Sequence, residues 1–97
     1  MDLVKRLLEI PDLDEGANET NPIAHLKFKN VLGRGTWYVT NMGTSEDDVL
    51  MFGYVESPLG EDCDEWGTFL LSELIKTGAI FLDQQFTPTP INNLIKN

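Results

Sequence analysis

The sequence is poor in the residues that build disulfides, thiolate zinc sites and basic surfaces. Its 97 residues include one cysteine, Cys63, and only seven lysines and arginines against sixteen aspartates and glutamates. A single cysteine forms no internal disulfide and no thiolate zinc site, which fits a reducing compartment. The net charge of -9 argues against direct binding to nucleic acid or anionic lipid, because both repel a surface of that sign.

Long apolar runs are also lacking. No stretch approaches the roughly 20 apolar residues of a membrane span, and residues 1–10 lack the apolar stretch of a signal peptide. We therefore expect a cytoplasmic protein. The composition, 41% hydrophobic and 24% charged, is typical of a globular chain. A chain of this length carries one hydrophobic core, so the sequence predicts a single domain over residues 1–97.

The N-terminal segment predicts an amphipathic helix and then an exposed connection. Within residues 1–10 the apolar side chains at helical spacing are Leu3, Val4, Leu7 and Leu8. The opposite side of that helix would carry Lys5, Arg6 and Glu9. Pro11 ends the helix, and residues 11–21 are acidic with few apolar side chains. We expect this connection to be solvated.

The next segments predict an antiparallel hairpin. Between Ile23 and Lys29 the chain alternates, and its inward-facing residues would be Ala24, Leu26 and Phe28. A turn at residues 33–35 with two glycines follows, and then a strand over Thr36–Asn41 that is rich in aromatic and β-branched residues. These two strands are the firmest part of the predicted fold.

Further short elements complete the prediction. After a loop over residues 42–48, Val49–Val55 is predicted as a third strand in which Gly53 marks a gap or bulge. The strand Trp66–Leu71 has apolar residues on both faces, which is typical of a central strand. A helix is predicted over Ser72–Thr77, with Ser72 as its N-cap and Gly78 after its last residue. A short strand over Ala79–Asp83, an extended segment over Thr87–Pro90 and a helix over Ile91–Lys96 follow. The predicted fold class is α+β: an antiparallel meander of four or five strands, with an N-terminal helix and short C-terminal helices.

Acidic residues are segregated along the chain. Residues 35–75 contain nine acids and no base, and most of these acids fall in two predicted turns. The candidate partner-binding residues are Glu46, Asp47, Asp48, Glu61, Asp62, Asp64 and Glu65. If the fold gathers them on one end or face, they would imitate a row of phosphates and bind a basic protein surface. The alternative is that they solvate loops and keep the protein soluble.

Other residue groups predict chemistry only weakly. His25 and Cys63 are the sole candidates for a base and a nucleophile, and no motif joins them. Asp62, Asp64 and Glu65 offer oxygen ligands but lack the spacing and glycine of a calcium loop. We therefore expect no catalytic residue, metal or cofactor.

The aromatic residues have two interpretations. Six of the nine aromatic residues are considered, namely Trp37, Tyr38, Phe52, Tyr54, Trp66 and Phe69. They would either stack on bases or pack in the core, and we expect core packing because no basic residues lie among them.

Four segments in order resemble a known family. They are Gly35-Thr36-Trp37-Tyr38-Val39-Thr40, Leu50-Met51-Phe52-Gly53-Tyr54-Val55, Gly67-Thr68-Phe69-Leu70-Leu71-Ser72-Glu73-Leu74 and Phe86-Thr87-Pro88-Thr89-Pro90-Ile91. Over roughly residues 22–95 the chain is similar to the domain-of-unknown-function family 2958, small proteins of phages, plasmids and conjugative elements. The chain departs from the family pattern at Asn41, where relatives carry an acid, and at Thr68, where they carry tyrosine. The resemblance implies a mobile-element origin and supplies no catalytic residue.

These observations predict a non-enzymatic accessory protein of a mobile genetic element that binds another protein. One form of this role is inhibition of a host defence or nucleic-acid-processing enzyme through nucleic-acid mimicry. The alternatives are a small hydrolase or transferase of unknown substrate and a generic oligomerising module. Small size, the lack of a catalytic constellation and the segregated acids favour the first interpretation.

Overall fold

The alternating strands of the sequence form the centre of an antiparallel sheet. The computed structural model describes residues 3–15 and 20–95. Its strands are β1 (Ile23–Ala24), β2 (Leu26–Asn30), β3 (Thr36–Ser45), β4 (Asp48–Glu56), β5 (Glu65–Leu70), β6 (Ile80–Leu82) and β7 (Thr89–Pro90). Its helices are α1 (Leu3–Leu8) and α2 (Leu71–Lys76), with 3₁₀ turns η1 (Glu61–Cys63) and η2 (Ile91–Asn93). Antiparallel strands with a few short helices thus make up the described chain.

The β2–β3 hairpin confirms the prediction. The two strands pair antiparallel from Leu26 opposite Val39 to Lys29 opposite Thr36. Gly35 closes the turn with a φ of 143°, a conformation that side chains other than glycine disfavour. The sheet grows outward from this hairpin.

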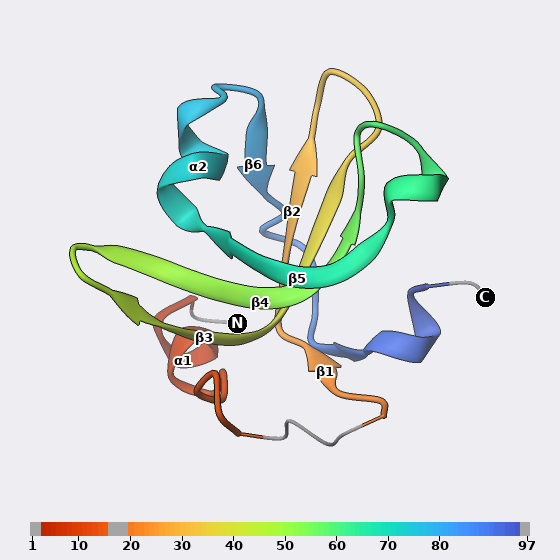
Figure 1. Ribbon diagram of the computed structural model, residues 1–97. Coiled ribbons are helices and arrows are strands. Elements are labelled where there is room, and N and C mark those ends of the chain that lie inside the picture. The colour runs from red at the N-terminus through yellow and green to blue at the C-terminus, as the bar shows by residue number, and fades with distance from the viewer. Residues whose placement is uncertain (1–2, 16–19, 96–97) are drawn as a thin grey trace.

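The full strand order is β5-β4-β3-β2-β6, so the meander covers only four strands. After β5 the chain crosses one face of the sheet as α2, and β6 then pairs with β2 at the far edge (Figure 1). The predicted central position of the strand over residues 66–71 was wrong, because β5 is an edge strand. Its two apolar faces are explained by Phe69, which lies in the core, and Trp66, which packs on β4 aromatics.

The β3–β4 hairpin is longer than predicted. The expected loop over residues 42–48 is mostly strand, and the turn consists of Glu46 and Asp47 alone. An irregularity lies in β3 between Val39 and Asn41, while Gly53 stands opposite on β4. A Cβ on Gly53 would lie 1.7 Å from the Tyr38 carbonyl oxygen, so this close approach requires glycine.

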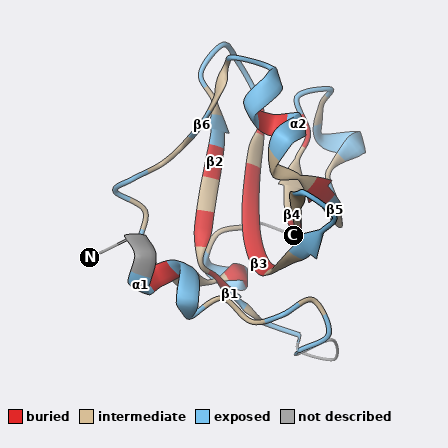
Figure 2. Ribbon diagram, turned by 90° about the vertical axis from the view of Figure 1, so that its left-hand side faces the viewer, coloured by how far each residue is buried: buried red, intermediate tan, exposed pale blue. Residues whose placement is uncertain are grey.

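The sheet buries side chains on both faces. One face carries the larger cluster, whose buried members are Leu26, Phe28, Trp37, Val39, Met51, Phe69 and Leu74. The other face carries a smaller one, Ala24, Tyr38 and Ile91. Figure 2 shows the buried residues concentrated on β2 and β3, with exposed residues on the outer side of α2 and in the loops. The opposite faces of β3 therefore pack different parts of the chain.

A small second sheet closes the second face. β1 pairs with β7 antiparallel, with Ile23 opposite Pro90. The Ile91 amide donates to the Pro22 carbonyl at 2.8 Å, and Ile91 is fully buried. The predicted helix Ile91–Lys96 is only the turn η2, and Lys96 lies outside the described residues.

Helix α1 is shorter than predicted and turned differently. Arg6 is buried, whereas Leu8 is 81% exposed and Leu7 also reaches solvent, so the predicted sides were wrong for these three residues. Lys5 and Glu9 are exposed, as predicted. Arg6 is turned toward the sheet because its Nη2 donates a hydrogen bond to the His25 carbonyl at 2.8 Å. The side chains of Leu3 and Val4 lie outside the described part. No helix within the described ranges has the length and apolar character needed to cross a membrane.

The connection after α1 is docked rather than free where it is described. The Met42 amide donates to the Pro11 carbonyl at 3.0 Å. The Asn41 side-chain amide donates to the carbonyls of Asp12 and Glu15, each at 2.8 Å. The exposure predicted for the connection over residues 11–21 is confirmed for Asp12, Asp14 and Glu15, although the backbone of residues 11–15 is tied to β3. Residues 16–19 lie outside the described chain. Asn41 is a buried anchor for this segment.

Helix α2 begins one residue earlier than predicted. Leu70 occupies the N-cap position, and its amide donates to the Glu73 carboxylate at 3.1 Å. Ser72 was the predicted cap, but it lies inside the helix and its hydroxyl donates to Asp48. Gly78 follows the helix with a φ of 72°, as predicted for its C-terminal glycine.

Candidate functional site

The two acidic turns lie at opposite ends of one strand. Glu46 and Asp47 form the turn before β4, and Glu61 and Asp62 lie in η1 beyond its other end. A nine-residue strand spans roughly 27 Å at about 3.3 Å per residue. In Figure 1 the β3–β4 turn and η1 stand on opposite sides of the molecule. The fold therefore does not gather the seven predicted residues into one continuous row.

Two of the seven acids have internal partners. Asp48 accepts the Ser72 hydroxyl and the Val49 amide, and these hydrogen bonds lower the pKa of its carboxyl. Asp64 accepts from Arg34, which holds the pKa of Asp64 below its usual range. Both carboxylates thus join segments of the chain. The remaining members of the set are exposed: Glu46, Asp47, Glu61, Asp62 and Glu65.

Arg34 ties two loops together at the η1 end of the sheet. Its guanidinium, in the β2–β3 turn, forms an ion pair with Asp64 at 2.7 Å and also donates to the Ser57 carbonyl. The Ser57 amide in turn donates to Asp64 at 2.6 Å. Inside the other loop the Leu59 amide donates to the Ser57 hydroxyl at 3.0 Å. Both loops are therefore held by polar contacts.

Apolar side chains project from these same two loops. Val31 is 61% exposed, Leu32 is 83% exposed and Leu59 is 84% exposed, and Pro58 is exposed beside them. Scattered exposed leucines are ordinary. Here Leu32 and Pro58 line one groove, and Val31 and Leu59 are their neighbours along the two loops that the ion pair joins. We call Val31, Leu32, Pro58 and Leu59 the loop-tip patch.

A groove adjoins the loop-tip patch on the face covered by α2. It has a volume of about 480 Å³, and its principal lining residues are Leu32, Trp37, Pro58, Phe69, Leu74 and Ile80. Leu32 and Pro58 belong to both surfaces, so the patch and the groove are continuous. Glu73 also lines the groove and places a carboxylate at its side.

A second, polar cavity lies at the other end of β2. Its volume is about 620 Å³, and its lining includes Glu9, Asp12, Glu15, His25 and Asn41. His25 Nδ1 is buried and has no hydrogen-bond partner among the described residues, and burial lowers the pKa of His25. The Asn41 amide is occupied by the chain itself, as described above. Within residues 3–15 and 20–95 no group of three His, Cys, Asp or Glu side chains is arranged to hold a metal ion.

The candidate base and nucleophile are not brought together. His25 lines the polar cavity between β1 and the connection, whereas exposed Cys63 ends η1 and is not part of that lining. Of the three acids considered as calcium ligands, Asp64 forms an ion pair with Arg34, whereas Asp62 and Glu65 are exposed. Among the described residues, neither of these two candidate groups is assembled.

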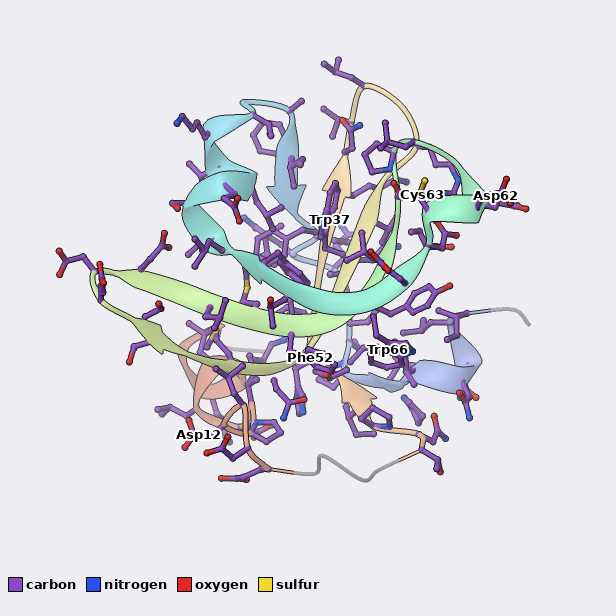
Figure 3. All side chains as sticks on the ribbon, viewed as in Figure 1. Asp12, Trp37, Phe52, Asp62, Cys63 and Trp66 are labelled. Atoms are coloured by element: carbon purple, nitrogen blue, oxygen red, sulfur yellow. The ribbon has the colours of Figure 1, made fainter. Side chains whose placement is uncertain are left out.

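The aromatic residues divide between the two faces of the sheet. Trp37, Tyr38 and Phe69 are buried, which confirms core packing for these three. Burial, with a contribution from Glu56, raises the pKa of Tyr38 to about 12. The other three of the six considered, Phe52, Tyr54 and Trp66, form a partly exposed cluster on β4 and β5. Figure 3 shows Trp37 on one side of the curved β4–β5 pair and Phe52 and Trp66 on the other.

Sequence reasoning missed the loop-tip patch. Its signal was present, because Val31 and Leu32 directly precede the turn glycine Gly33, and Leu59 stands between Pro58 and Gly60. Large apolar residues inside turns have no strand or helix to bury them. Their presence in two turns is a usable indication of an exposed binding surface.

Comparison with known proteins gives a family but no activity. Neither the curated proteins nor the solved structures contain a match to this chain. Residues 2–89 match the family described as protein of unknown function (DUF2958). The match covers most of the chain and agrees with the resemblance of the four motif segments. The chain therefore belongs to this family of proteins of unknown function.

Proposed function

We propose that the protein is a non-enzymatic accessory protein that binds another protein through the loop-tip patch and the adjoining groove. The observation that carries this proposal is the exposure of Leu32 and Leu59 on loops held by the Arg34–Asp64 ion pair. Burial of one leucine side chain contributes about 1.5–3 kcal/mol, and a rigid loop loses little further entropy on binding. The arrangement suits a stable contact with a partner.

The charges near this surface define the partner's chemistry. Glu61 and Asp62 lie directly after Leu59 and Gly60 along the chain, and Glu73 lines the groove. A complementary partner would present apolar side chains flanked by lysine or arginine. A host enzyme whose nucleic-acid-binding surface is basic fits this description, and a mobile-element origin in the cytoplasm would bring the two together.

Phosphate mimicry is the narrower form of the proposal. It now rests on the η1 acids alone, because Glu46 and Asp47 lie beyond the other end of the nine-residue strand β4. We retain the η1 acids as a rim that steers a basic partner toward the loop-tip patch. The distant turn is assigned to solvation.

The other functions receive less support from the geometry. A small enzyme is the alternative that one observation favours, because the polar cavity places His25 beside the carboxylates of Glu9, Asp12 and Glu15. That cavity lacks the thiol of Cys63, the candidate nucleophile. An oligomerising module would bring two chains of net charge -9 together, which costs electrostatic repulsion. A separate basic partner avoids this cost.

Comparative affinity capture from host lysate tests the proposal. The bait proteins are wild type, the double variant Leu32→Ser with Leu59→Ser, and the control Leu8→Ser, which changes an equally exposed leucine on α1. We expect a host protein that wild type and the control retain and the double variant loses. Equal capture of every host protein by all three baits would contradict the proposal. Circular dichroism checks that each bait is folded.

A further inference from the structure

One long edge of the sheet is left unpaired. β5 pairs with β4, and no strand of the described chain lies along its other edge. It has six residues, whereas β6 at the opposite edge has only three. Natural edge strands are commonly protected by lysine, proline or a covering element. β5 contains neither residue type, and its backbone groups are thus available to another strand.

Among the described residues, a side chain accepts a hydrogen bond from the free edge of β5 at its C-terminal end. The Leu70 amide donates to the Glu73 carboxylate at 3.1 Å, which finishes the strand where α2 begins. For the other β5 amides the structure gives no partner among the described residues other than β4 itself. An added strand would therefore pair along Glu65–Phe69.

An aromatic cluster lies directly beside the edge. Trp66 is 39% exposed, and its ring stacks on Phe52 at 5.8 Å and meets the edge of Tyr54 at 5.6 Å. In Figure 3 Phe52 and Trp66 lie next to each other below the β4–β5 pair. Thr68 is the next residue of β5 on this face and is exposed. Aromatic faces attract ammonium and guanidinium groups, so this face suits a cationic side chain.

The acidic residues near β5 determine which kind of partner strand could pair with it. Glu65 stands in β5 itself, Glu61 and Asp62 precede it, and residues 35–75 contain no lysine or arginine. A second copy of this chain would bring a net charge of -9 against the same acids. A basic segment would be attracted by them, and its lysines or arginines would alternate onto the aromatic face.

We propose that β5 accepts an extended, lysine- or arginine-bearing segment of a partner protein as a sixth strand of the sheet. Backbone hydrogen bonds to β5 supply the register, and Trp66 with the η1 acids selects basic side chains. This site uses none of the residues of the loop-tip patch, although both surfaces share the η1 acids as neighbours. It gives the protein a second surface that recognises a segment of sequence rather than a folded face.

The test uses a short synthetic peptide that alternates lysine and valine, titrated into isotope-labelled protein and followed by NMR. We expect the amide signals of residues 65–69 to shift and their hydrogen exchange to slow. A peptide with the same side chains but alternate N-methylated amides cannot pair and should not bind. A glutamate–valine peptide should not bind either, because its charge is repelled.

Two variants sharpen the result. Trp66→Ala should weaken the peptide about two- to fivefold, the loss expected for an exposed cation–π contact. The Leu32→Ser, Leu59→Ser variant should bind the peptide as wild type does, which separates this site from the proposed function. Equal binding of the N-methylated peptide, shifts away from β5, or no binding would overturn the proposal. So would β5 shifts that grow with protein concentration alone, since these would identify a second copy as the occupant.

Discussion

The guanidinium of Arg34 donates two hydrogen bonds to the carboxylate of Asp64, from Nη1 to Oδ1 at 2.8 Å and from Nη2 to Oδ2 at 2.7 Å. The two residues are thirty positions apart along the chain. Their contact joins the β2–β3 turn to the segment between β4 and β5. The loop-tip patch depends on this contact, because Leu32 and Leu59 project from the two joined loops.

Removing the Asp64 carboxylate should therefore loosen the loops. In Asp64→Ala the Ser57 amide loses its acceptor and Arg34 loses its ion pair. We expect faster hydrogen exchange at the Ser57 and Leu59 amides, measured by NMR, with the rest of the sheet unchanged. The matched control is Asp62→Ala, an exposed acid with no such contact in the described structure. Unchanged exchange at Ser57 would show that the ion pair does not order the loop.

Gly53 should be irreplaceable by alanine. The new Cβ would lie 1.7 Å from the Tyr38 carbonyl oxygen, and backbone atoms cannot rotate away as a side chain can. We expect Gly53→Ala to lower the free energy of unfolding by at least about 2 kcal/mol. Gly67→Ala on the neighbouring strand is the control, because its Cβ meets nothing within 4 Å. Urea denaturation compares the two, and equal midpoints would refute the close approach.

Stability should depend on pH through His25. Burial lowers the pKa of His25 below its ordinary 6.5, with Arg6 acting in the same direction and Glu9 against it. The unfolded chain therefore binds a proton more readily than the folded chain. As pH falls through 6.5 toward the folded pKa, the protein should lose stability, and above 6.5 this contribution is complete. Denaturation across this range should show a steeper loss for wild type than for His25→Gln; parallel curves would contradict the prediction.

The two acidic turns should act differently in association. Replacing Glu61, Asp62 and Glu65 by Gln, Asn and Gln should slow association with the captured partner, most strongly at low salt. Replacing Glu46 and Asp47 by Gln and Asn should leave the association rate unchanged, because that turn lies at the far end of β4. Stopped-flow or surface-binding kinetics at several salt concentrations compare the variants. Equal slowing by both sets would favour a general charge effect over a steering rim.

Local pattern predicted the central hairpin but not the sheet order. The alternation that includes Leu26 and Phe28 needs only one buried face, and that requirement is visible in a single strand. The pairing of β6 with β2 depends on α2 crossing the sheet to bury Leu74, which no local pattern records. The strand over residues 66–71 was placed centrally because it has apolar residues on both faces. In the structure it is an edge strand, and Trp66 packs on the aromatic side chains of the neighbouring strand.

The polar anchors were hidden for a similar reason. Arg6 has the residue type of a solvated helix face, yet its buried guanidinium holds the His25 carbonyl across a gap of nineteen positions. Asn41 likewise holds carbonyls of the preceding connection. The loop-tip patch could not be predicted from the sequence for the same reason. The Arg34–Asp64 ion pair that joins its two loops is a contact between residues far apart along the chain.

The central claim is that the protein binds its partner through the loop-tip patch. The dissociation constant of the complex with the purified partner tests this claim most directly. It is measured by calorimetry for wild type, for the Leu32→Ser, Leu59→Ser variant and for the Leu8→Ser control, with folding confirmed for each. Loss of two buried leucine contacts at more than about 1 kcal/mol each should weaken binding by a factor of about thirty or more, while the control binds as wild type. A double variant that binds as tightly as wild type would contradict binding through the loop-tip patch.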